Sequence, residues 1–252
     1  MSDPTRPDGR RDDEMRPAKI TTGVIKHAEG SVLIEAGATH VICTASVEDR
    51  VPFWLKEKKQ GWVTAEYAMI PRATKERTPR ESGRGPSGRS QEIQRLVGRA
   101  LRAVVDMTAF ADRTIILDCD VVQADGGTRC ASITGAYVAL VQALAWIRAN
   151  GILVRAPLTG MVSAVSVGMV EGRPRLDLTY VEDSSADVDM NVIRTDTGRY
   201  VEVQGTAEKT PFTRGDLDRL LALADAGTDR LFDLQREALG DLLSPLLRAR
   251  AG

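Results

Sequence analysis

Three different local patterns follow one another between Thr114 and Asn150, and this succession constrains the fold more than any other part of the chain. Residues 114–124 are β-branched and partly alternating in polarity, which predicts a strand. Residues 132–150 repeat apolar side chains at helical spacing, which predicts a long helix. Asp125-Gly-Gly-Thr-Arg129 lies between the two patterns, so a strand, a glycine turn and a helix start are expected to meet here.

The glycine turn carries groups that suit an anion. Two adjacent glycines, Gly126 and Gly127, let the backbone point successive N–H groups at one spot, and Thr128 and Arg129 add a hydroxyl and a guanidinium. An ordinary tight turn is the alternative that these residues alone leave open. The segment is neither a Walker A loop nor a dinucleotide fingerprint, because it lacks a Gly-Lys-Ser/Thr ending and a third spaced glycine.

The order of elements predicts an α+β fold with two halves, each made of strands followed by helices. The first half has short β-rich runs at 20–26, 31–36, 40–48 and 62–69, an expected surface loop over 71–90, a helix from Ser90, and then the strand and helix described above. The second half has runs at 161–170, 175–181, 188–195 and 200–204, followed by a helix that opens near Thr213 and is separated by Gly227 from a last helix. We therefore expect halves at 1–155 and 156–240, and a flexible tail over 241–252.

Composition excludes several classes of function. The hydrophobic content of 42% is ample for a core. No stretch approaches the roughly 18 apolar residues needed to cross a bilayer, and the charged N-terminus lacks a signal-peptide core, so we expect a cytoplasmic protein without a membrane partner. The cysteines are odd in number and lack CxxC spacing, which favours free thiols. With only His27 and His40, histidine-based metal sites and triads are not expected, and the chemistry falls to Arg, Asp, Glu and Ser/Thr.

Basic residues are concentrated in one block, although the net charge of the chain is only −1. The block runs from Arg72 to Arg102, and arginine dominates it, which favours phosphate as a ligand. On the expected helix, Arg95, Arg99 and Arg102 fall on one side, continuing from Arg89 just ahead of it. A solvated helix face is the alternative to anion binding. The cations of the block are Arg72, Lys75, Arg77, Arg80, Arg84, Arg89, Arg95, Arg99 and Arg102.

Acidic residues gather between two expected strands of the second half, from Glu182 to Asn191. Asp187 and Asp189 have the period-two spacing that points side chains to the same face of a strand. Carboxylates this close repel one another unless a cation joins them, and oxygen ligands of this kind suit Mg²⁺. A turn in which Asp and Ser bond the local backbone is the alternative, and the residues taken alone favour it.

Taken together, the chain resembles the bacterial ribonuclease PH family of phosphate-dependent exoribonucleases, over nearly its whole length from Arg6 to Leu239. Several colinear motifs are more specific than any one of them. The motifs are Arg6-Pro-Asp-Gly-Arg10, Glu29-Gly-Ser-Val32, Ala45-Ser-Val-Glu-Asp-Arg50, Gly61-Trp-Val-Thr-Ala-Glu-Tyr67, Pro71-Arg-Ala-Thr74, Gly88-Arg-Ser-Gln-Glu-Ile-Gln-Arg-Leu96, Gln123-Ala-Asp-Gly-Gly-Thr-Arg129, Glu182-Asp-Ser-Ser-Ala186 and Val188-Asp-Met-Asn191.

The resemblance implies an activity and an assembly. The family trims the 3′ ends of transfer-RNA precursors, releases nucleoside diphosphates and also runs the reverse nucleotidyltransferase reaction. Its fold is a duplicated-looking α+β arrangement, of the ribosomal protein domain-like βαβ type, assembled as a hexameric ring, a trimer of dimers. Implied partners are inorganic phosphate, Mg²⁺ (or Mn²⁺) and RNA, with ribosomal RNA as a second substrate class.

The resemblance also assigns roles to individual residues. It implies phosphate binding by Arg89, Gly127, Thr128 and Arg129. Asp183 and Asp189 match the family's catalytic carboxylates, which are also its metal ligands. Arginines that match RNA-binding positions are Arg72, Arg77, Arg80, Arg95 and Arg99.

Two other functions are alternatives to this one. A catalytically silent RNA-binding ring subunit would keep the fold and the arginines without turnover, and the presence of Arg89, Gly127-Thr128-Arg129, Asp183 and Asp189 argues against it. A nucleotide-binding switch or kinase lacks its P-loop lysine.

Overall fold

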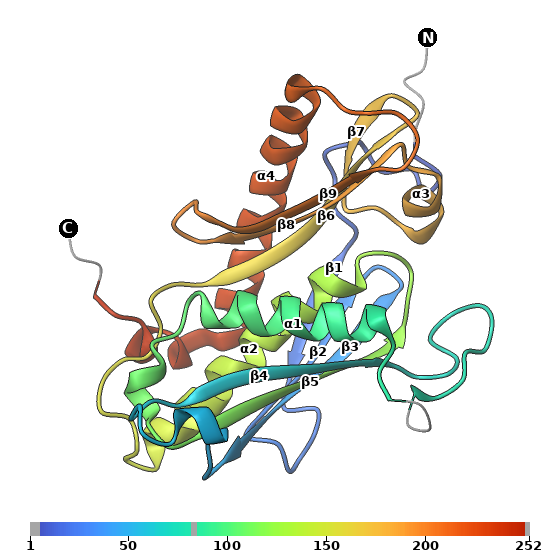
Figure 1. Ribbon diagram of the computed structural model, residues 1–252. Coiled ribbons are helices and arrows are strands. Elements are labelled where there is room, and N and C mark those ends of the chain that lie inside the picture. Colours follow the sequence, from blue (N-terminus) through green and yellow to red (C-terminus); the bar gives the residue numbers. More distant parts are fainter. Residues whose placement is uncertain (1–5, 82–84, 250–252) are drawn as a thin grey trace.

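The computed structural model describes residues 6–81 and 85–249. Within them the chain forms two β-sheets with helices packed between and beside them (Figure 1). Arg84 of the basic block lies outside the described residues, as do residues 1–5 and the last three residues of the predicted tail.

The first sheet has five strands in the order β1-β2-β3-β5-β4. Neighbouring strands are antiparallel except for β4 and β5, which are parallel and are connected through helix α1 (Gly88–Arg102). A parallel pair needs such a crossover because its strands cannot be joined by a tight turn. Its strands are β1 (Ala18–Thr22), β2 (Gly30–Ala36), β3 (Thr39–Glu48), β4 (Trp62–Met69) and β5 (Thr114–Gln123).

Helix α2 (Thr128–Ala149) lies between the two sheets and contacts β2, β3 and β5 of the first and β6 of the second (Figure 1). Its side chains are buried on every side from Cys130 to Val141. A helix that is apolar all round is stable only where protein surrounds it, and the two sheets supply that environment.

The second sheet has four antiparallel strands in the order β7-β6-β8-β9. They are β6 (Val162–Val170), β7 (Arg173–Leu176), β8 (Val188–Thr195) and β9 (Tyr200–Ala207). Helix α4 (Arg214–Leu239) packs along β6 and β7, and the short helix α3 (Tyr180–Ser185) joins β7 to β8. The predicted α+β fold, with strands followed by helices in each half, is confirmed. Four 3-10 turns complete the described elements: η1 (Phe53–Leu55), η3 (Met107–Phe110), η4 (Gly240–Leu242) and η5 (Ser244–Leu246).

The strand predicted over 175–181 is wrong in its second half. β7 ends at Leu176, because Asp177 takes a left-handed backbone conformation with φ of 53°. Thr179 and Glu182 then form a reciprocal capping box that starts α3. A Thr-x-x-Glu spacing is a sequence signature of a helix start, and the β-rich pattern around it concealed the signal.

The predicted helix break at Gly227 is also wrong, since α4 runs without interruption through this residue. Gly227 is buried, and a Cβ atom there would lie 2.8 Å from Leu176 Cδ1 and 3.3 Å from Val165 Cγ2. The glycine therefore lets the helix approach the second sheet closely, which offsets its helix-propensity cost of about 1 kcal/mol.

The flexible tail expected over 241–252 is contradicted for its described part. Leu243 and Leu246 are buried, and the backbone of Leu158 pairs with the segment: its N–H donates to Leu246 O (2.9 Å) and its carbonyl accepts from Arg248 N–H (2.8 Å). Apolar leucines at helical spacing give this segment a face to bury, and the first half of the chain covers it.

Of the helices that the structure describes, one has the length and hydropathy of a membrane span, contrary to the expectation that no stretch would. An 18-residue window of α2 has a mean hydropathy of 1.6, and 83% of that window is buried inside the protein. Small polar residues interrupt the apolar run of α2, so a count of consecutive apolar residues does not identify this helix. Core helices pass the same test, and the finding is weak support for a membrane segment.

Candidate functional site

The glycine turn after β5 forms the N-terminal end of α2. Gly126 and Gly127 have φ of 76° and 68°, and Gly127 is the helix N-cap without a side-chain cap bond. The first helical bond runs from Ala131 N–H to Gly127 O, which leaves the preceding helical N–H groups without an intrahelical partner. Free N–H groups and the positive end of the helix dipole make this point attractive to an anion.

The turn needs glycine for space as well as for conformation. A Cβ atom on Gly126 would lie 2.4 Å from Leu178 O and 2.9 Å from Tyr180 N, so the turn touches the backbone that leads into α3. Thr39 secures the turn from the first sheet: its hydroxyl donates to Gly126 O (2.7 Å) and accepts from Asp125 N–H (2.9 Å). The strand, the turn and the second half of the chain are therefore fixed to one another here.

Thr128 and Arg129 present polar groups beside the turn. Tyr67 Oη donates to Thr128 Oγ1 (3.0 Å), so the hydroxyl proton of Thr128 is free to bond another acceptor. Arg129 Nη2 pairs with Glu92 Oε2 (3.0 Å), while its Nε is buried with no partner among the described residues. A buried guanidinium N–H without an acceptor is the donor that an incoming anion would satisfy.

Asp183 on α3 and Asp189 on β8 form a close carboxylate pair. Burial raises the pKa of Asp183. Burial, followed by the negative charge of Asp183, raises the pKa of Asp189 to about 6. Two carboxylates that share a site cannot both ionise at their ordinary values, so the pair favours either a proton or a cation between them.

One cavity of about 330 Å³ brings these groups together. Its walls include all six of the residues predicted to bind phosphate or to carry the catalytic carboxylates: Arg89, Gly127, Thr128, Arg129, Asp183 and Asp189. Asp187, which the sequence placed on the same strand face as Asp189, does not line this cavity and lies 3.9 Å from Lys209 Nζ. The cavity thus has cationic and N–H groups from the first half of the chain and carboxylates from the second.

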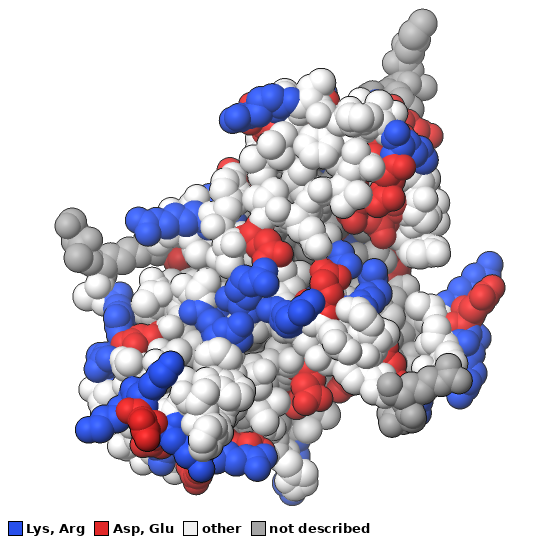
Figure 2. Space-filling model, viewed as in Figure 1, with Lys and Arg blue, Asp and Glu red and all other residues white. Residues whose placement is uncertain are grey.

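The predicted RNA-binding arginines lie outside the cavity. Arg95 and Arg99 are exposed on α1, and Arg72, Arg77 and Arg80 are exposed on the loop that follows β4. Figure 2 shows basic side chains gathered over α1 and a second basic group on the loop beside it. Arg99 pairs with Glu202, whereas the other four have no ion-pair partner in the part of the chain that the structure describes. These arginines therefore lie on the surface of α1 and of the loop after β4, and none of them lines the cavity.

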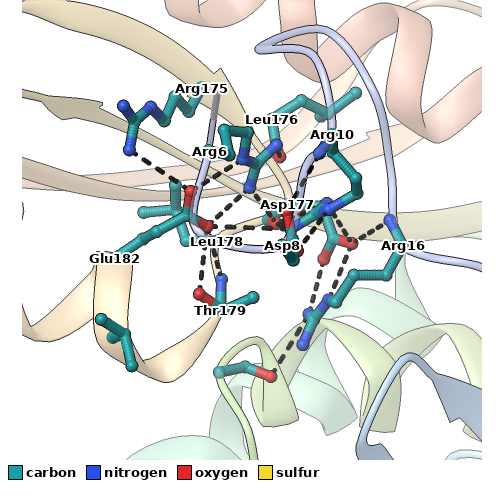
Figure 3. Close-up of polar contacts among 12 residues, drawn as sticks. Arg6, Asp8, Arg10, Arg16, Arg175, Leu176, Asp177, Leu178, Thr179 and Glu182 are labelled. Carbon is teal, nitrogen blue, oxygen red and sulfur yellow. Dashed lines mark hydrogen bonds and ion pairs between the residues drawn. The ribbon is translucent and has the colours of Figure 1, made fainter. Parts of the chain in front are cut away.

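The sequence did not indicate the residues that position the site residues without lining the cavity. Glu92 supports Arg129, and its other oxygen accepts from Gln204 Nε2 (3.2 Å) on β9. Glu182, next to Asp183, is buried and paired with Arg6 (Figure 3). These pairs join positions more than 30 residues apart, so no local pattern could have identified them, apart from the capping-box spacing of Glu182.

We expect Asn in place of Asp189 to stabilise the metal-free fold near neutral pH. A carboxyl whose pKa is higher in the folded protein than in the unfolded chain costs stability once it ionises. The cost starts as pH rises above the unfolded value of 3.8 and is complete above the folded value of about 6.

Chemical denaturation in EDTA measures this effect. Asp189→Asn should raise the free energy of unfolding by about 1 to 3 kcal/mol at about pH 7.5, and by close to zero at about pH 4, where the wild-type carboxyl is already protonated. A variant that is less stable than the wild type at the higher pH would contradict the raised pKa.

Two family domains match the chain in order. Residues 14–144 match domain 1 of the 3′ exoribonuclease family, and residues 160–227 match its domain 2. The first match ends within α2 and the second begins just before β6, so the boundary between them lies near the point where the second sheet begins.

Solved structures that share the fold include the following three. Rice (Oryza sativa) Rrp46 superposes with a TM-score of 0.76 at 19% identity, covering 93% of this chain and 100% of that one. A chain of the Archaeoglobus fulgidus exosome with RNA bound to the active site gives 0.77 at 23%, covering 91% and 92%. An archaeal exosome core gives 0.73 at 21%, covering 92% and 91%. Because the first family domain alone spans more than half of the sequence and the second follows it in order, this chain belongs to the 3′ exoribonuclease family.

Proposed function

We propose that the chain is a phosphate-dependent 3′→5′ exoribonuclease that releases nucleoside diphosphates from RNA and also runs the reverse nucleotidyltransferase reaction. The observation that carries this proposal is the single cavity in which the glycine turn, Arg89 and Arg129 face Asp183 and Asp189. A phosphorolytic enzyme needs such an arrangement, since it must bring an anionic nucleophile to an anionic phosphodiester.

The attacking reagent is inorganic phosphate, which is already ionised at neutral pH, so a strong general base is not the main requirement. Arg89, Arg129, the Thr128 hydroxyl and the N–H groups of the turn would hold it in line with the last phosphodiester. A phosphate oxygen forms a bond to the terminal phosphorus, and the bond from that phosphorus to the 3′-oxygen of the preceding nucleotide breaks. The freed 3′-oxygen takes up a proton, leaving a shortened RNA and a nucleoside diphosphate.

Asp183 and Asp189 would hold Mg²⁺, or Mn²⁺ in its place. Their donor set fits, because hard oxygen ligands that repel each other suit a divalent cation. Among the described residues no group of three or more His, Cys, Asp or Glu side chains is arranged to hold a metal, so the ion would take its other ligands from water and substrate phosphate, as Mg²⁺ commonly does. When bound, it supplies stabilisation of the negative charge on the transferred phosphoryl oxygens.

RNA is the proposed substrate, and transfer-RNA precursors are its proposed class, with ribosomal RNA second. The exposed arginines Arg72, Arg77, Arg80, Arg95 and Arg99 would contact the phosphates of the strand that leads into the cavity. The Archaeoglobus fulgidus exosome structure, which has RNA bound to its active site, supports an RNA substrate for this fold. A cytoplasmic homo-hexamer, built as a trimer of dimers, is the proposed working form, since arginines of neighbouring subunits would then converge on one strand.

Incubation of a 3′-extended transfer RNA with Mg²⁺, with and without inorganic phosphate, tests the proposal. We expect trimming only with phosphate, and nucleoside diphosphates as the product. Equal trimming in both tubes, or nucleoside monophosphates as the product, would show a hydrolase instead. RNA binding without turnover would identify the chain as a silent ring subunit.

A further inference from the structure

The N-terminal arm, the described residues 6–17 before β1, carries three buried arginines, Arg6, Arg10 and Arg16, and all three contact Asp177 between β7 and α3 (Figure 3). Arg6 is the innermost: its side chain is 0% exposed and that of its partner Glu182 is 1% exposed. Arg6 Nε and Nη2 donate to the two carboxylate oxygens of Glu182 at 2.7 and 2.6 Å, and Nη1 donates to Leu176 O at 2.7 Å. Burying charges costs several kcal/mol per ion unless the geometry is good and the remaining donors are satisfied. This network meets both conditions.

The Arg6 pair holds the helix that carries Asp183. Glu182 accepts from the N–H and the hydroxyl of Thr179, at 3.0 and 3.1 Å, and so caps α3 at the same time as it pairs with Arg6. Because Asp183 is the next residue on this short helix, its position follows from that of Glu182.

Arg16 connects this region to the glycine turn. On one side its Nε and Nη2 donate to Asp177 Oδ2 and Oδ1 at 2.9 and 2.7 Å, and its backbone N–H donates to Oδ2 at 2.8 Å. On the other side Nη1 donates to Asp125 O at 2.5 Å, and Nη2 lies 3.5 Å from Gly126 O. One guanidinium therefore joins the segment before α3 to the carbonyl groups of the turn.

The bonds to the turn carbonyls set the direction of the turn N–H groups. In a trans peptide the N–H points opposite to the C=O of the same unit. With Asp125 O and Gly126 O held by Arg16, and Gly126 O also held by Thr39, the N–H groups of Gly126 and Gly127 face away from Arg16. Both glycines have a left-handed backbone conformation, and glycine can adopt many other conformations as well. Contacts from outside the turn are therefore needed to fix its conformation.

We propose that Arg16 is a positioning residue, which fixes the orientation of the phosphate-binding turn and its distance from the Asp183 helix, while Arg6 fixes that helix. The inference rests on the proposed function in that the turn's ligand is inorganic phosphate. Arg16 does not line the cavity and would not touch the substrate. Its effect would reach the bound phosphate only through the turn.

Arg16→Met and Arg16→Lys, with Arg11→Met as the matched control, test this role. Arg11 lies on the same arm, but its side chain is 72% exposed, and within the described ranges it pairs only with Asp13 and Glu14. Three quantities are measured on the full chain: the rise in thermal unfolding midpoint produced by inorganic phosphate, the KM for phosphate in RNA trimming, and the Kd for RNA without phosphate. The rise in thermal midpoint can be measured without turnover. An inactive wild type would therefore refute the proposed function, while the role of Arg16 in phosphate binding could still be tested.

Arg16→Met should lose most of its stabilisation by phosphate, and its kcat/KM for phosphate should fall about 10²-fold, the scale set by misplacing a reacting group by about 1 Å. The Kd for RNA should stay within about twofold, because the exposed arginines are untouched. Arg16→Lys keeps the positive charge but lacks the planar guanidinium that can donate to Asp177 and to the turn at the same time. Its thermal midpoint without phosphate should therefore approach that of the wild type, while its phosphate binding stays weak.

Several results would overturn the proposal. Phosphate affinity like that of the wild type in either Arg16 variant would show that the turn orients itself. Equal losses in Arg11→Met would show a general effect of charge on the arm. Loss of RNA binding to the same extent as phosphate binding, or failure of both Arg16 variants to fold, would show a purely structural role.

Discussion

Asn in place of Asp183 or Asp189 should lower kcat for RNA trimming about 10³-fold, the upper end of what removing one electrostatic group from a reacting centre costs. Both substitutions keep the side-chain volume and remove a negative charge from the wall of the cavity. Each would take away one of the two carboxylates proposed to hold the metal. The Kd for RNA in the absence of phosphate should change by less than about twofold, since the arginines proposed to bind the strand lie outside the cavity.

Asp187→Asn is the matched control for these variants. Asp187 lies in the same segment and is half-buried, but its neighbour is Lys209 and it does not line the cavity. Its kcat should stay within about twofold of the wild type. Full activity in both Asp183→Asn and Asp189→Asn, or an equal loss in Asp187→Asn, would refute the assigned role of the pair.

A metal titration separates a lost ligand from a lost charge. Mg²⁺ should raise the thermal midpoint of the wild type, because an ion that binds only the folded state stabilises it. It should have little effect on either Asn variant. Asp189→Asn would then be more stable than the metal-free wild type and nearly inactive, which is the trade-off expected of a site built from groups that repel each other.

The fold could be predicted from the sequence where the patterns are local. Alternating and helical periodicity placed most strands and helices, and Gly126-Gly127 placed the turn between β5 and α2. The errors lie where tertiary contacts override a local rule. Gly227 resembles a helix end in sequence, yet it serves the packing of α4 on the second sheet.

The candidate site was predictable only in part. The glycine turn could be read as an anion site from five residues, because all its groups are neighbours in sequence. The acidic segment taken alone favoured an ordinary turn. Its spacing paired Asp189 with Asp187, and only the resemblance to a family paired it with Asp183. These two aspartates lie close to Arg89 and Arg129 because of how the two sheets pack around α2. No residue spacing along the chain indicates this packing. The same holds for Arg16 and Asp177, which are 161 positions apart.

Methionine in place of Arg129 should raise the KM for inorganic phosphate and lower kcat/KM about 10²- to 10³-fold, the cost of removing one donor aimed at developing charge. The surroundings of this guanidinium suit an anion. Its Nη2 lies 3.0 Å from Glu92 Oε2, the side chain is 18% exposed, and its Nε is buried without a partner among the described residues. Methionine keeps the apolar stem in place. Glu92 keeps its bond from Gln204 and is 34% exposed, so losing Arg129 should cost the fold little.

Arg148→Met provides the comparison, because Arg148 lies on the same helix but in its last turn, exposed and outside the cavity. It should leave both phosphate KM and RNA Kd within about twofold of the wild type. Initial rates of RNA trimming over a range of phosphate concentrations, measured side by side for the three proteins, decide the matter. If Arg129 instead contacts the RNA strand, its replacement will weaken RNA binding and leave the phosphate KM unchanged. That result would contradict the assignment of Arg129 to the phosphate site. A selective rise in the phosphate KM would place the nucleophile at the N-terminal end of α2, since Arg129 is fixed there by its own helix and by Glu92.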